Sequence, residues 1–140
     1  MTFRLLIVDD DPVTLLGLRD ALQLRFADAT ITTVDSAENA LSVMNTSRFD
    51  AVVTDVKMPG IGGMALLSKI KRRYPECLVF VMTAHDPELH AEALRHGAYA
   101  FIPKPLDMEL LPRLLSRAFN HGRLINVVHD RNRQSIGSDQ

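Results

Sequence analysis

Five short apolar runs recur along the chain, separated by segments with a different hydrophobic spacing. The runs lie at residues 5–8, 29–34, 51–54, 78–82 and 98–102. Each run has the length of a β-strand. The segments between them place apolar residues three or four positions apart, as at Leu15, Leu18 and Leu22, which is the spacing of one helix face. The pattern predicts that a strand and a helix alternate five times.

The runs are apolar at nearly every position rather than at alternate positions. Strands of this kind are buried on both faces, as in a parallel sheet that helices cover on two sides. A length of 140 residues suits one domain of ordinary size. The chain is therefore predicted to be a single α/β domain built on a parallel sheet.

Capping residues indicate where the helices begin. Asp11 and Asp86 each precede a proline suited to a first helical turn, and Ser36 and Asp107 are candidate caps for two further helices. Pro112 lies five residues after Asp107, where a proline inside a helix would clash with a carbonyl one turn earlier. We expect the last helix to begin later than Asp107 or to have an irregular first turn.

Composition and charge narrow the class of protein. Hydrophobic residues make up 46% and charged residues 24%, as in ordinary globular domains. The net charge of −1 provides no overall basic field for nucleic acid or an anionic membrane. The apolar run at 5–8 is too short for a signal peptide or a bilayer span, so we expect a cytoplasmic protein. The only cysteine, Cys77, lies in an apolar run and is expected to be a reduced core residue.

Helical spacing fades after about residue 124, and the segment 123–140 is mostly polar. It is predicted to be either a frayed tail or the start of a linker to an output domain, which leaves 1–122 as the folded domain. No DNA-binding or catalytic output domain is expected within this chain.

The residues that follow the apolar runs are chemically informative, because ligands of open parallel sheets bind at the carboxyl ends of the strands. Asp9 and Asp10 follow the first run, Asp55 the third, Thr83 the fourth and Lys104 the fifth. Several carboxylates, one hydroxyl and one cation are therefore predicted to meet at one edge of the sheet.

Crowded carboxylates repel one another, and a divalent cation relieves that repulsion. Oxygen ligands with positions left for water and phosphate favour Mg²⁺, for which Mn²⁺ can substitute. A carboxylate beside a metal and a lysine can attack a phosphoryl group. We expect Asp9 and Asp10 to hold Mg²⁺, Asp55 to be the nucleophile, Thr83 to donate a hydrogen bond to a phosphoryl oxygen, and Lys104 to neutralise another.

The strings LLIVDDDP, VVTDVKMPGIGG, VMTA and IPKP resemble, in order and position, the receiver domains of two-component response regulators. The resemblance spans about residues 3–122. It implies a doubly wound sheet of five parallel strands in the order 2-1-3-4-5 with five helices. It also implies that the chain is a signalling phosphoacceptor, which supports only its own phosphoryl transfer and autodephosphorylation, rather than an enzyme.

The family's metal pair matches Asp9 and Asp10, and its phosphoacceptor, which is also a metal ligand, matches Asp55. Lys57 matches the residue whose backbone carbonyl binds the metal. Asp11 is then a helix cap, and the peptide bond before Pro105 is expected to be cis.

Thr83 and Phe101 match the switch residues of receivers, which couple phosphorylation to a face formed by helix 4, strand 5 and helix 5. An aromatic residue at 101 is also compatible with simple core packing. Lys57 and His85 match the two positions that tune dephosphorylation; both side chains are large, so we expect a phosphoryl lifetime of minutes or longer. The other histidines are expected to be solvated or to lie at helix ends.

The resemblance implies a histidine kinase or a histidine phosphotransfer protein as the phosphoryl donor, and a possible homodimer through the same face. Two alternatives stay open. One is a phosphatase of the haloacid-dehalogenase type with Asp9 as nucleophile, and the other is an interaction module that does not respond to phosphate.

Overall fold

The computed structural model describes residues 3–84 and 86–120. Strands and helices alternate along the chain as the hydrophobic pattern predicts. The elements are β1 (Arg4–Val8), α1 (Pro12–Arg25), β2 (Thr30–Val34), α2 (Ala37–Thr46), β3 (Ala51–Asp55), α3 (Gly62–Arg73), β4 (Leu78–Ala84), α4 (Pro87–Arg95), β5 (Ala100–Lys104) and a last helix over 110–120. The tail predicted over 123–140 lies outside the described residues.

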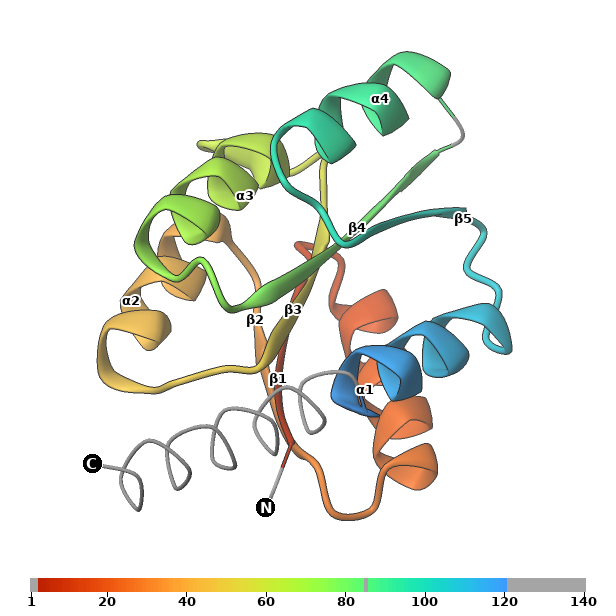
Figure 1. Ribbon diagram of the computed structural model, residues 1–140. Coiled ribbons are helices and arrows are strands. Elements are labelled where there is room, and N and C mark those ends of the chain that lie inside the picture. Colours follow the sequence, from red (N-terminus) through yellow and green to blue (C-terminus); the bar gives the residue numbers. More distant parts are fainter. Residues whose placement is uncertain (1–2, 85, 121–140) are drawn as a thin grey trace, which may run out of the picture.

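The strands form one parallel sheet in the order β2-β1-β3-β4-β5. Helices α2, α3 and α4 cover one face, while α1 and the helix over 110–120 cover the other (Figure 1). This is the doubly wound fold that the family resemblance implies. Among the described helices, none combines the length and the apolar character needed to cross a bilayer.

Each face of the sheet has its own core, and successive strand residues alternate between the two. In β1, Leu6 and Val8 belong to the cluster under α2, α3 and α4, whereas Leu5 and Ile7 belong to the cluster under α1 and the last helix. All four are buried. Burial on both faces explains why the strand sequences are apolar throughout.

The fifth strand begins two residues later than the apolar run predicts. The backbone N–H of Ala98 still donates to Ala93 at the end of α4, and regular pairing starts where Ala100 lies opposite Phe80. The strand then continues through Pro103, which an edge strand tolerates because it pairs on one side only. Lys104 is therefore the last residue of β5 rather than the residue after it.

The capping predictions are confirmed. The side chains of Asp11, Ser36 and Asp86 each accept a hydrogen bond from a backbone N–H in the first turn that follows. Asp107 accepts from two such groups, but the regular helix begins only at residue 110, after a turn. The carbonyl one turn before Pro112 thus belongs to that turn, which accommodates the proline as expected.

Cys77 is a buried free thiol, as predicted for a core residue. Burial raises its pKa to about 12, although the nearby charge of Lys71 opposes this shift. The thiol is therefore protonated at neutral pH and is a poor nucleophile.

Gly63 is the position in α3 where a side chain fits least well. A Cβ atom there would lie 2.0 Å from the carbonyl oxygen of Asp55 and 2.7 Å from Cα of Val56. Gly63→Ala is expected to lower the free energy of unfolding by about 1–3 kcal/mol, as overpacking against backbone does. Urea denaturation measures this change.

Gly17 in α1 is the matched control, since a Cβ there would meet nothing within 4 Å. Gly17→Ala should stabilise the protein by up to about 1 kcal/mol through helix propensity. Equal effects of the two substitutions would contradict the close approach of α3 to β3.

Candidate functional site

Three carboxylates meet at the carboxyl edge of the sheet, as the sequence predicts. Asp9 and Asp10 directly follow β1, and Asp55 ends the neighbouring β3. One carboxylate oxygen from each lies within 4.8 Å of the others. Asp9 and Asp55 are buried, whereas Asp10 is exposed. The cluster therefore has a closed inner side and an open outer side.

Lys104 supplies the positive charge of the site. Its Nζ donates a hydrogen bond of 2.9 Å to Asp55 Oδ2 and lies 3.5 Å from Asp9 Oδ2. Burial by itself lowers the pKa of Lys104, but the hydrogen bond and charge of Asp55, together with the charge of Asp9, raise the pKa above its ordinary value. The lysine is thus held in its charged form beside both acids.

Asp55 is fixed through both of its carboxylate oxygens. Oδ2 accepts from Lys104, and Oδ1 accepts from the backbone N–H of Lys57 at 3.2 Å. Its side chain keeps 9% of its surface exposed, compared with 1% for Asp9. Asp55 is therefore the more accessible of the two buried acids.

Asp9 carries an oxygen, Oδ2, that is paired with the charge of Lys104 but receives no hydrogen bond from the described residues. Oδ1 accepts from the backbone N–H of Asp11 at 2.9 Å, but Oδ2 is buried without a hydrogen-bond partner among the described residues. Burial raises the pKa of Asp9, and the charge of Asp55 adds to this, while the Asp11 hydrogen bond and the charge of Lys104 oppose it. A buried anionic oxygen beside two further carboxylates fits a hard divalent cation such as Mg²⁺.

Thr83 is buried near the end of β4, the strand between Asp55 and Lys104. The residue before Thr83 pairs with Asp55, and the residue after it pairs with Lys104. The sheet register therefore brings the predicted hydroxyl to the same edge as the acids and the lysine. The Lys104-Pro105 peptide is cis, as the resemblance implies.

Phe101 lies in β5 opposite Val81 and packs partly against the core under α4. Its ring stacks on the imidazole of His90 from α4, a contact that the sequence analysis missed because it joins two different elements. His85 lies outside the described residues.

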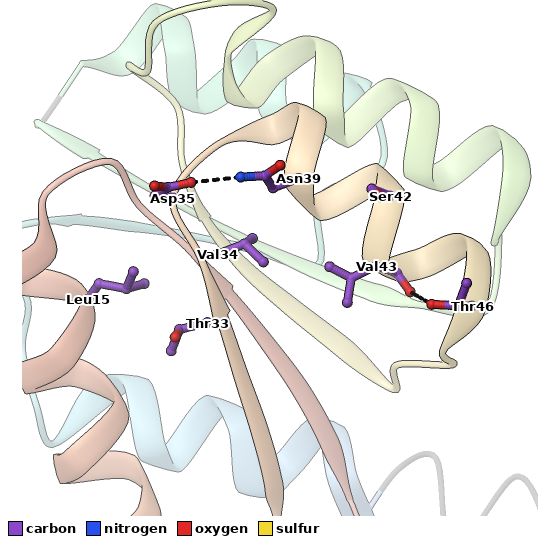
Figure 2. A pocket seen from close by; sticks show the side chains of 8 residues that line it. All are labelled: Leu15, Thr33, Val34, Asp35, Asn39, Ser42, Val43 and Thr46. Atoms are coloured by element: carbon purple, nitrogen blue, oxygen red, sulfur yellow. Dashed lines mark hydrogen bonds between the residues drawn. The ribbon is translucent and has the colours of Figure 1, made fainter.

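A groove of about 620 Å³ occurs elsewhere, at the edge of the sheet formed by β2. Figure 2 shows it lined mainly by β2 and α2, with the carboxylate of Asp35 already accepting a hydrogen bond from Asn39. None of the predicted site residues lines it. The groove and the acidic cluster are therefore separate features of the described structure.

Comparison with known proteins agrees with this geometry. Residues 5–116 match the family model of the response regulator receiver domain. The chain belongs to this family. Its receiver fold also resembles the response regulator receiver domain protein of Clostridium thermocellum, with a TM-score of 0.80, 28% identity, and coverage of 88% of this chain and 98% of that one.

A beryllofluoride-activated DrrB receiver domain matches with a TM-score of 0.78 and 27% identity over 86% of this chain and 99% of that one. Among longer relatives, the DNA-binding transcriptional regulator NtrC of Klebsiella pneumoniae is 38% identical over 116 residues, and the response regulator FleR of Pseudomonas aeruginosa is 39% identical over 118. These alignments cover 82% and 84% of this chain. They cover only 24% of either relative.

The buried charge of Asp9 is expected to destabilise the metal-free receiver. Because folding raises the pKa of Asp9 above 3.8, the unfolded chain loses this proton first, so stability falls as the pH rises from that value through the folded pKa. Asp9→Asn should therefore raise the free energy of unfolding at neutral pH in EDTA, on the order of 1 kcal/mol. Chemical denaturation measures the change.

The same variant should gain less stability than the wild type when Mg²⁺ is added. Asp20→Asn is the control, since it removes an equal charge from an exposed position of α1. A metal-free Asp9→Asn protein that is less stable than the wild type would contradict the unfavourable burial of this charge.

Proposed function

We propose that Asp55 accepts a phosphoryl group from a histidine kinase or a histidine phosphotransfer protein. The observation that supports this most directly is the position of its carboxylate, which accepts from Lys104 within a cluster of three acids. An Asp55 oxygen attacks the phosphorus of the donor phosphohistidine, a P–O bond forms as the P–N bond breaks, and the electron pair returns to the donor nitrogen.

Asp9, Asp10, Asp55 and the backbone carbonyl of Lys57 would hold Mg²⁺, or Mn²⁺ in its place. The bound cation would neutralise part of the negative charge of the phosphoryl group. Lys104 neutralises further charge through Nζ, and the raised pKa of Lys104 keeps it protonated for this role. The N–H of Lys57 orients the Asp55 carboxylate from the other side.

Thr83 and Phe101 connect the modified site to a protein-binding face. We assign Thr83 to a hydrogen bond with one phosphoryl oxygen, so that a change at Asp55 moves the end of β4. Phe101 lies on the adjacent β5, next to α4. The responding face is formed by α4, β5 and the helix over 110–120, where a target or a second copy of the chain would bind.

Several relatives, such as NtrC, are DNA-binding transcriptional regulators, and this chain spans about a quarter of their length. We assign no direct nucleic-acid or membrane binding to this chain. We infer that the chain acts in the cytoplasm, where a histidine kinase or a histidine phosphotransfer protein would be its phosphoryl donor.

Two other functions are less well supported by the site. A phosphatase that used Asp9 as its nucleophile would need an accessible oxygen, but this carboxylate is almost completely buried, and one oxygen accepts from Asp11. A module that ignored phosphate would have no use for three convergent acids and a lysine. Both alternatives make different predictions for Asp55.

Asp55→Asn is expected to abolish labelling by acetyl phosphate in the presence of Mg²⁺, because it removes the nucleophile. Intact-mass spectrometry and peptide mapping measure the incorporation and its position. Asp20→Asn serves as the control and should be labelled like the wild type. Labelling that persists in Asp55→Asn and maps to Asp9 would favour the phosphatase, and an unlabelled wild type would favour the phosphate-independent module.

The lifetime of the phosphoryl group is expected to be minutes or longer, because the family resemblance assigns Lys57 and His85 to the two positions that tune dephosphorylation and both have large side chains. Replacement of both by alanine should accelerate the loss of label after the donor is removed, as followed by mass spectrometry over time. The Lys57 side chain is exposed, and urea denaturation of the double variant checks that it remains folded. Identical decay in the wild type and the double variant would remove the basis for steric protection.

A further inference from the structure

The stack between His90 and Phe101 lies outside the acidic cluster and is not needed for its chemistry. The ring centroids are 4.7 Å apart and the ring planes differ by only 8°. His90 is exposed on α4, whereas Phe101 is half-buried in β5. The imidazole therefore covers a ring that would otherwise be more open to solvent.

The contacts of Phe101 show why the stack with His90 affects the position of its ring. Phe101 packs against the core cluster beneath α2, α3 and α4, to which Ala93 of α4 also belongs. As a phenylalanine it has no hydroxyl with which to hydrogen-bond to a neighbour. Its position in the surface layer is therefore determined by packing and ring stacking alone.

The backbone of His90 is held by hydrogen bonds in the first turns of α4. Its N–H donates to the carbonyl of Asp86, whose side chain in turn caps α4 by accepting from the N–H groups of Glu88 and Leu89. The imidazole is thus carried on the well-anchored first turns of a helix. Phe101 pairs with Val81, two residues before Thr83 on the neighbouring strand.

We propose that His90 is a positioning residue that holds Phe101 in its resting place and so opposes the switch to the phosphorylated state. This inference rests on the proposed function of Asp55. When Thr83 is drawn toward the phosphoryl group, Phe101 follows only by leaving the stack. The stack therefore lowers the population of the switched state and sets how much phosphorylation is needed to reach it.

His90→Ala removes the stack at an exposed position, and His90→Phe keeps an aromatic ring there. One aromatic pair shifts an equilibrium by about twofold to tenfold. The beryllofluoride concentration that half-saturates the receiver in excess Mg²⁺ should therefore fall by about that factor in His90→Ala and stay near the wild-type value in His90→Phe. Leu94→Ala, a change at another exposed site of α4, should leave it unchanged.

The NMR signals of the Phe101 ring provide the direct readout, with ¹³C-labelled phenylalanine in the full chain. In the resting wild type, His90→Ala should shift these signals by removing the ring current of the imidazole, and beryllofluoride should shift them in the same direction. Equal half-saturation in the wild type and His90→Ala would overturn the role of His90 alone. A wild type that does not respond at Asp55 would overturn the proposed function and this inference with it.

Discussion

The ion pair between Lys104 and Asp55 is the interaction on which the arrangement of this site depends. The two residues are far apart in sequence, and they meet because β4 lies between β3 and β5 and all strands run in the same direction. In an antiparallel sheet, the carboxyl ends of neighbouring strands lie at opposite edges, so Asp9 after β1 and Thr83 on β4 would be separated from Asp55 on β3. The lysine also compensates for two buried acids, of which Asp9 retains an oxygen without a hydrogen bond among the described residues. The fold thus tolerates an unfavourable charge arrangement at the place where a cation and a phosphoryl group would be bound.

The loop after Asp55 shows how closely the scaffold is built around this residue. Gly63 approaches the backbone of Asp55 and Val56 more closely than any side chain would permit, and its N–H donates to the carbonyl of Val56. The start of α3 is therefore docked directly against the end of β3. Such docking limits the freedom of Asp55, whose two oxygens are already held by Lys57 and Lys104. If Asp55 is the nucleophile that we propose, it needs little rearrangement to meet a phosphorus atom.

Much of this arrangement could be predicted from the sequence, because strand ends in a parallel sheet converge whatever the loops between them do. Asp9, Asp55 and Lys104 were placed by that rule alone, whereas the strand order and the cis bond before Pro105 came from the family resemblance. The apolar run predicts the start of β5 two residues too early, because Ala98 is apolar but its N–H still donates to Ala93 at the end of α4. The stack of His90 on Phe101 had no signal in the sequence, since two residues on different elements meet only when the tertiary packing is known.

The position of Phe101 on an edge strand would allow its side chain to move beside a rigid site, as we propose. The inner strands β1 and β3 are buried on both faces, and a ring in either could not move without opening a cavity in a close-packed core. β5 pairs with β4 alone and is only partly buried, so its side chains have space toward solvent. A ring with space to move also needs a contact that fixes its resting orientation. Apolar packing on one side of the Phe101 ring does not favour one orientation over another. The ring of His90 on α4 meets that requirement without adding a charge or a hydrogen bond to the acidic site itself.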